Sequence, residues 1–195
     1  MPECTMPYAL TMRQDSTDRG SQGSLESRQP HVDAYHAIIS KRDRRDYDSR
    51  PIPEDALHRI LQAGRMSGTS SNSQLLRLIV LNDRAALEKL VPAGRGTAPM
   101  LKAPLSIAIV YKDGGSAFDV GRVAQNMMVA AWADGIINCP QGIQNQTIAR
   151  AALGLPEDCS VGMCIAFGYP DASAEKRESR PRVPLDEVVH WGRWS

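Results

Sequence analysis

Residues 117–134 constrain the fold more than any other part of this 195-residue chain. At a helical period, their apolar side chains fall on most sides of the helix instead of on one stripe. Such a helix must be covered by a sheet and by a second surface, and a partner subunit is the simplest source of that surface. Because Arg122, Gln125 and Asn126 interrupt the apolar pattern, the segment is not predicted to span a membrane.

Short apolar runs alternate with helical patterns along the rest of the chain. Buried strands are predicted at residues 78–81, 105–111 and 161–167, with a further strand leading into the turn at residues 139–142. Amphipathic or capped patterns predict helices at residues 54–66, 84–91 and 146–153. One domain containing both helices and a sheet follows, and the spacing alone leaves open whether the sheet is parallel or mixed.

The two ends of the chain differ in character. Residues 1–31 are polar and have no sustained apolar period, so they are predicted to form a flexible tail before a folded domain at residues 32–195. Asp33 is the expected N-cap of the first helix. The last residues, by contrast, include Trp191 and Trp194 and are too hydrophobic for a free tail, so they are expected to dock on this chain or on a neighbour.

Composition argues against several classes of function. A hydrophobic fraction of 42%, a charged fraction of 23% and a net charge of +1 give no overall bias toward nucleic acid or membrane. The four cysteines form no C-x-x-C pair and the four histidines lack metal-ligand spacing, so no metal site is expected. Reduced cysteines and the lack of a signal-peptide pattern predict a cytoplasmic protein.

Sequence motifs for side-chain catalysis are also missing. The chain has no dinucleotide-binding glycine fingerprint, no Walker A loop and no G-x-S-x-G elbow. No catalytic side chain is therefore predicted, which favours an enzyme whose chemistry resides in a cofactor that the protein binds and orients.

The basic segment KRDRRDY, residues 41–47, carries four cations and two carboxylates before its aromatic residue. By itself it fits a solvated helix end, a nucleic-acid patch or a site for one small anion. The interleaved Asp43 and Asp46 argue against nucleic acid. Arginine presents a planar fork of donors to phosphate, which favours an anion site.

Several short motifs, taken in order, resemble the FMN-dependent nitroreductase family. They are KRDRRDY at residues 41–47, SGTSSNSQLL at 67–76, CPQG at 139–142, LGLPED at 153–158 and FGYP at 167–170. The resemblance implies an α+β fold with a mixed central β-sheet flanked by helices. It also implies an intertwined homodimer, in which a C-terminal extension reaches onto the partner, and FMN as cofactor with NADH or NADPH as reductant.

The resemblance assigns roles in cofactor binding to three groups of residues and to Asp43. Cations would hold the FMN phosphate and ribityl chain, Asp43 would orient arginines or accept from ribityl hydroxyls, a polar loop would bind the ribityl chain and ring, and a turn would pass the flavin edge. The cations are Lys41, Arg42, Arg45 and Arg182, the loop residues are Thr69, Ser70, Asn72 and Gln74, and the turn residues are Gln141 and Gly142.

The activity implied is hydride transfer from NAD(P)H through flavin N5 to a nitroaromatic, quinone or similar acceptor, by a ping-pong mechanism. Two alternatives remain open within the same resemblance: a flavin destructase that fragments reduced FMN, and a flavin-binding or sensing module without turnover. Gly68 stands where the family usually has proline and Leu75-Leu76 replaces Pro-Trp, which alters the loop beside the flavin.

Overall fold

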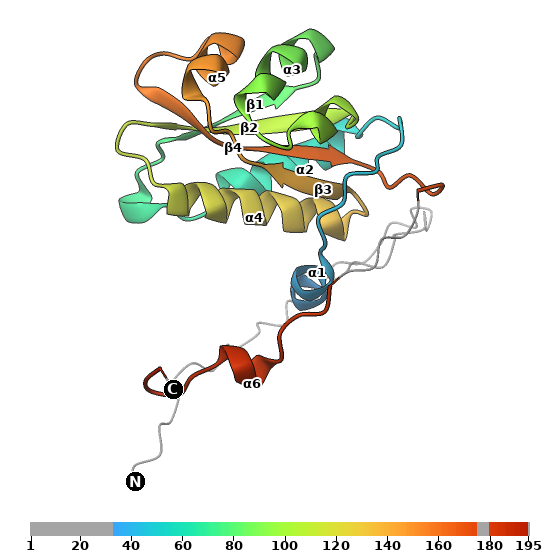
Figure 1. The fold of residues 1–195 in the computed structure, drawn as a ribbon, viewed down its shortest axis with the longest axis vertical. Helices are drawn as coiled ribbons and strands as arrows, with labels where there is room; N and C mark the ends of the chain where they lie inside the picture. The colour runs from blue at the N-terminus through green and yellow to red at the C-terminus, as the bar shows by residue number, and fades with distance from the viewer. Residues whose placement is uncertain (1–32, 175–179, 195) are drawn as a thin grey trace, which may run out of the picture. The chain divides into compact units, whose positions relative to one another are not determined.

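The computed structural model describes residues 33–174 and 180–194, and the tail predicted at residues 1–31 lies outside the described residues. A four-stranded sheet in the order β1-β2-β4-β3 forms the centre of the fold. Its strands are β1 (Leu76–Leu81), β2 (Leu105–Lys112), β3 (Ile137–Gln141) and β4 (Cys159–Gly168). The α+β architecture predicted from the sequence is confirmed (Figure 1).

The pairing of the strands corrects the expectation of a mixed sheet, because all three ladders are antiparallel. β2 and β3 run in the same direction and are connected through a helix, but β4 lies between them and pairs with both. The two parallel strands are therefore never neighbours. Among the described residues, parallel pairing is confined to one isolated bridge between Asp43 and Asn138.

Helices cover both faces of the sheet, as Figure 1 shows. α2 (Glu54–Arg65) and α4 (Ala117–Ala133) pack on one face, and α3 (Arg84–Leu90) and α5 (Gln146–Leu153) pack on the other. Alternate residues of β2 divide between the two cores: Ile107 and Ile109 join the α2/α4 side, and Ala108 and Val110 join the α3/α5 side.

α4 has the second covering surface that its apolar sequence requires, and α2 supplies most of it. The two helices approach so closely that a Cβ added at Gly64 would lie 2.9 Å from the Sδ of Met127. The prediction that a partner subunit provides this surface is therefore wrong for most of the helix. Of the large apolar side chains of α4, only Phe118 remains exposed, at 69%.

Local sequence signals set the ends of the helices. α1 (Ala34–Ser40) begins at Asp33, whose carboxylate accepts the N–H of His36 at 3.0 Å, as predicted. α5 ends at Gly154, which has a φ of 63° and so occupies the left-handed conformation that glycine adopts at little cost.

Apolar side chains are exposed in two segments at the ends of the described chain. In α1, Tyr35, Ile38 and Ile39 are 67%, 55% and 48% exposed, and around α6 (Leu185–Val188) the exposed apolar side chains include Trp191. Within residues 33–174 and 180–194, no helix is long and apolar enough to cross a membrane. The same residues contain no group of three His, Cys, Asp or Glu side chains that could hold a metal ion.

Candidate functional site

The basic segment, residues 41–47, runs in an extended conformation along the outer edge of β3. Lys41 leaves the helix with a φ of −57° and a ψ of 131°. Asp43 then forms its parallel bridge with Asn138, and the N–H of Arg44 donates to the carbonyl of Asn138 at 3.1 Å. The backbone of the segment is thus attached to the sheet and does not continue α1 as a charged helical face.

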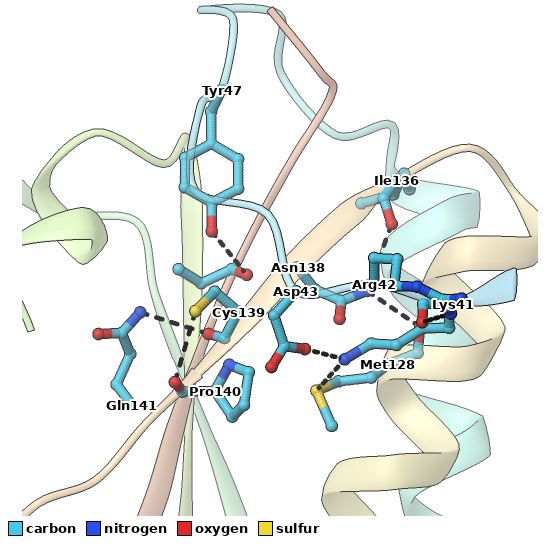
Figure 2. A network of polar contacts seen from close by, with 11 residues as sticks. Lys41, Arg42, Asp43, Tyr47, Met128, Ile136, Asn138, Cys139, Pro140 and Gln141 are labelled. Atoms are coloured by element: carbon cyan, nitrogen blue, oxygen red, sulfur yellow. Dashed lines mark hydrogen bonds and ion pairs between the residues drawn. The ribbon is translucent and has the colours of Figure 1, made fainter. Parts of the chain in front are cut away.

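Asn138 connects the basic segment to the core and was not foreseen from the sequence. Its side chain is 0% exposed, and its Nδ2 donates to the carbonyls of Met128 at 2.9 Å and Ile136 at 3.4 Å (Figure 2). Its buried Oδ1 has no hydrogen-bond partner among the described residues. The signal in the sequence was an amide between the apolar Ile137 and Cys139.

Lys41 and Asp43 form an ion pair inside the basic segment (Figure 2). The lysine side chain is only 8% exposed, and its Nζ also lies 3.4 Å from the Sδ of Met128. Asp43 was expected to orient arginines or to accept from a ligand; in this structure its carboxylate contacts the lysine. The charge of Lys41 is consequently neutralised within the segment.

Arg42 and Arg45 are exposed, and no carboxylate pairs with either of them in the described part of the chain. The Nη1 of Arg42 donates to the carbonyls of Ile39 and Lys41, each at 2.8 Å. Arg45 lies near the thiol of Cys139: burial raises the pKa of this thiol, and the positive charge of Arg45 opposes the rise. Arg44 likewise has no ion pair with a described carboxylate but is half-buried, so Arg42 and Arg45 are the exposed members of three uncompensated arginines at the edge of β3.

Tyr47 anchors the end of the basic segment. It forms an antiparallel bridge with Pro170, and its hydroxyl donates to the carbonyl of Ala166 at 3.4 Å. Burial raises the pKa of the Tyr47 phenol well above its usual value. The anchor is therefore neutral throughout the ordinary pH range.

The turn residues Gln141 and Gly142 lie at the end of β3. Gln141 is 3% exposed and its Nε2 donates to the carbonyl of Cys139 at 3.4 Å, so its amide is directed into the protein. Gly142 is exposed, and its N–H makes no hydrogen bond with another described residue. Of these two residues, Gly142 has the donor that remains available to a ligand.

The polar loop, residues 67–74, follows α2 and contains an unusual backbone. Ser71, Asn72 and Gln74 have φ values of 53°, 51° and 53°, although none of them is glycine. The left-handed conformation costs an L-residue roughly 1–2 kcal/mol. A stretch with three such residues needs contacts from its surroundings to persist.

Contacts within the polar loop close it on itself. The N–H of Gln74 donates to the hydroxyl of Thr69 at 3.4 Å, and the N–H of Asn72 donates to the carbonyl of Thr69 at 3.1 Å. Thr69 is half-buried, while Ser70, Asn72 and Gln74 are exposed. The loop therefore presents polar side chains on a compact turn.

A cavity of about 700 Å³ opens beside the polar loop, against α2 and β1. Its floor is apolar, its rim is basic and polar, and three of the predicted loop residues line it. The floor includes Leu61, Leu78, Val80 and Val123, the rim includes His58, Gln62, Arg65 and Arg77, and the loop residues are Thr69, Asn72 and Gln74. The sequence had given no indication of this cavity.

The two groups of predicted site residues lie toward opposite ends of α4 (Figure 1). Asp119 accepts the N–H of Ser70 at 3.3 Å, and nine residues later the Sδ of Met128 lies 3.4 Å from the Nζ of Lys41. A helix rises 1.5 Å per residue and turns once every 3.6 residues, so these contacts are about 14 Å apart along α4 and on opposite sides of it. One chain thus brings Lys41 and Asp43 together at β3, but it does not bring the polar loop to them.

Arg182 joins neither group. It is exposed in the stretch before α6, and in residues 33–174 and 180–194 no hydrogen bond or ion pair links it to the basic segment or to the polar loop. Its predicted role in phosphate binding stays a prediction.

The family described as "Nitroreductase family" matches residues 38–115 and 100–169 of this chain. Among curated relatives, an "NADH dehydrogenase" of Thermus thermophilus is 27% identical over 208 residues, which cover 86% of this chain and 100% of that protein. An "NADPH-flavin oxidoreductase" of Vibrio harveyi is 28% identical over 175 residues, covering 78% of this chain and 71% of that protein.

Solved structures share the fold. An FMN-dependent nitroreductase from Clostridium difficile superposes with a TM-score of 0.73 at 22% identity, covering 81% of this chain and 98% of that one. The NADPH:FMN oxidoreductase of Vibrio harveyi, in complex with NAD+, superposes with a TM-score of 0.75 at 23% identity, covering 83% of this chain and 78% of that one. Because the family match extends over more than half of the sequence, this chain belongs to the nitroreductase family.

Proposed function

We propose that this chain is an NAD(P)H-dependent FMN oxidoreductase that passes electrons to a nitroaromatic, quinone or similar acceptor by a ping-pong mechanism. Family membership and the names of the flavin and nicotinamide oxidoreductases that it resembles support the proposal. When bound, FMN supplies the redox chemistry by taking up a hydride at N5 and releasing electrons to the acceptor.

The observation that carries the proposal is the pair of uncompensated guanidinium groups at the edge of β3. Arg42 and Arg45 are exposed there and have no carboxylate partner in the described chain, so both can donate to phosphate. Gly142, just past the end of the same strand, has an N–H that finds no acceptor among the described residues. These groups suit a ligand with an anionic end and a hydrogen-bond acceptor farther along.

The protein's own side chains supply binding and orientation. Cys139 lies beside the basic segment and Tyr47 is its last residue, and burial raises the pKa of both. Neither therefore provides a thiolate or phenolate near neutral pH. That no side chain acts as a catalyst stays a prediction.

We propose that two copies of the chain assemble each flavin site. The basic segment and the polar loop contact opposite sides of α4, with Lys41 at Met128 and Ser70 at Asp119, so a cofactor that contacts both needs the loop of a second copy. The exposed Tyr35, Ile38 and Ile39 of α1 supply apolar surface for such a homodimer.

The C-terminal segment, residues 183–194, is the proposed cover of the partner's cavity. It exposes Leu185 and Val188, and between them lie the acidic Asp186 and Glu187. The cavity beside the polar loop has the complementary pattern, with an apolar floor below a basic rim. Binding of this segment across two copies would bury both surfaces.

Flavin binding is the first test of the proposed function. Purified full-length protein, titrated with FMN and followed by flavin fluorescence, is expected to bind one FMN per chain, and sedimentation is expected to give the mass of a dimer. Protein that is colourless and does not change the fluorescence of added FMN would contradict the proposal. A monomer that binds FMN would contradict only the shared site.

Turnover is tested by anaerobic titration with NADH and, separately, NADPH while the flavin spectrum is recorded. Bleaching by one nicotinamide and recovery of the colour with a nitroaromatic or a quinone is the expected result. A flavin that neither nicotinamide bleaches favours the sensing module. Recovery of intact FMN after reoxidation in air contradicts the destructase alternative.

A further inference from the structure

One face of α4 contacts the polar loop from outside the cavity. Asp119, Arg122 and Asn126 lie on this face, at the spacing of residues that share one side of a helix. Asp119 contacts Ser70, Arg122 lies against Gly68, and Asn126 contacts Ser67. The Nδ2 of Asn126 donates to the hydroxyl of Ser67 at 2.8 Å. The contacts run antiparallel along two turns of the helix, so they hold the first part of the loop as a unit.

Asp119 is the buried member of this set. Its side chain is 4% exposed, its Oδ2 accepts the N–H of Ser70 at 3.3 Å, and its Oδ1 has no hydrogen-bond partner in the described chain. The nearest cation is Arg122, whose Nη1 lies 4.0 Å from Oδ1. A buried carboxylate is costly unless it is compensated. The first turn of α4 compensates part of that cost through its N-terminal dipole.

The hydrogen bond from Ser70 to Asp119 lies next to the strained part of the loop. The left-handed residues are Ser71, Asn72 and Gln74, and Ser73 between them is right-handed. Such a backbone persists only where its surroundings determine it. The bond from Ser70 joins this stretch to α4, and Asn72 and Gln74 line the cavity.

We infer that Asp119 is a positioning residue: its buried carboxylate holds residues 70–74 in the conformation that presents Asn72 and Gln74 to the cavity. The effect on the flavin rests on the proposed function, whereas the effect on the loop does not. Asp119 does not line the cavity, and it acts through the backbone of Ser70.

The experiment compares Asp119→Leu, which removes the acceptor, with Asp119→Asn, which keeps the shape and an acceptor oxygen but removes the charge. Asp55→Asn is the matched control, because Asp55 is an exposed aspartate in the first turn of α2. Amide hydrogen exchange of residues 67–74 is measured without FMN, and the Kd for FMN is measured by fluorescence. In the leucine variant, the amides of residues 67–74 are expected to exchange about tenfold faster, and the Kd for FMN is expected to rise about tenfold. The asparagine variant is expected to show smaller changes in both quantities. The control is expected to match the parent.

Each outcome decides a different part of the inference. Unchanged loop exchange in both Asp119 variants overturns it, and faster exchange with an unchanged Kd for FMN overturns its functional part. If the parent binds no FMN but the leucine variant loosens the loop, the proposed function fails while the positioning role stands. If the leucine variant does not fold, loop exchange in Asp119→Asn and in Asn126→Ala tests the inference instead. Asn126 is exposed, and its replacement removes the hydrogen bond to Ser67.

Discussion

The basic segment and the polar loop are held in place by different means. The basic segment is attached by its backbone, through the bridge of Asp43 with Asn138 and the N–H of Arg44. The polar loop has a strained backbone, and side chains of α4 hold it. Backbone pairing does not depend on which side chain each residue carries, so the charges of the basic segment can be removed without moving it. In the polar loop, conformation and side-chain contacts are inseparable.

The largest effect is expected where charge can be removed without structural change. Replacing Arg42 and Arg45 together by alanine should weaken FMN binding at least about a hundredfold, because each charge-assisted hydrogen bond contributes roughly 1.5–3 kcal/mol. The melting temperature should stay within about 2 °C of the parent, since both side chains are exposed. Fluorescence titration and thermal unfolding measure the two effects.

The matched control for this pair is Arg84→Ala, which removes an exposed arginine paired with Glu88 on α3. It should leave the Kd for FMN unchanged. If the double variant binds FMN as tightly as the parent, or if it unfolds at a much lower temperature, the basic segment does not combine an anion site with a backbone anchor.

A second prediction concerns the anchor beneath the basic segment. Asn138→Ala removes the donor to the carbonyls of Met128 and Ile136 in a fully buried position. The loss should lower the free energy of unfolding by about 1–3 kcal/mol, measured by urea denaturation. Gln125→Ala, at an exposed position of α4, should change it by less than about 0.5 kcal/mol. Equal stability of the two variants would show that Asn138 contributes nothing to the anchor.

A third prediction uses pH to weaken the attachment of the basic segment at Tyr47. Burial raises the pKa of this phenol above the unfolded value of about 10. As pH rises past that value, the unfolded chain releases the proton while the folded chain retains it, so stability falls. Tyr47→Phe should cost less than about 1 kcal/mol at pH 7, because the hydrogen bond to Ala166 is long, and should lose less stability than the parent above pH ~10. The free energy of unfolding of both proteins is measured by urea denaturation at several pH values. If it falls equally in the parent and in Tyr47→Phe above pH ~10, this account is contradicted.

The sequence predicted the ends of helices, because these depend on a few neighbouring residues. Asp33 caps α1 as expected, and α5 ends at Gly154 as expected. Pairing could not be predicted in the same way. A strand buried on both faces gives the same apolar run whether its neighbours are parallel or antiparallel, so nothing local indicated that β4 lies between β2 and β3.

The site was predictable in its charges but not in its partners. The density of cations identified the basic segment, whereas the pairing of Lys41 with Asp43 depends on how the chain turns after α1. Asp119 was missed because an acidic residue in the first turn of a helix is ordinarily exposed and satisfied by the helix itself. Its burial arises from the packing of the polar loop against α4, which local patterns do not report.

The smallest effect is expected at Gly68, where the loop and α4 come closest. A Cβ added there would lie 2.4 Å from the Nη2 of Arg122, so the guanidinium must move in Gly68→Ala. Because Arg122 is exposed and flexible, the cost should be under about 1 kcal/mol, and amide exchange of residues 67–74 should rise only slightly. In an Arg122→Ala background the same change should cost nothing, since the obstructing group is gone. If a double-mutant cycle shows no coupling between Gly68→Ala and Arg122→Ala, Arg122 does not contact the loop. Asp119 and Asn126 are then the residues of α4 that hold it.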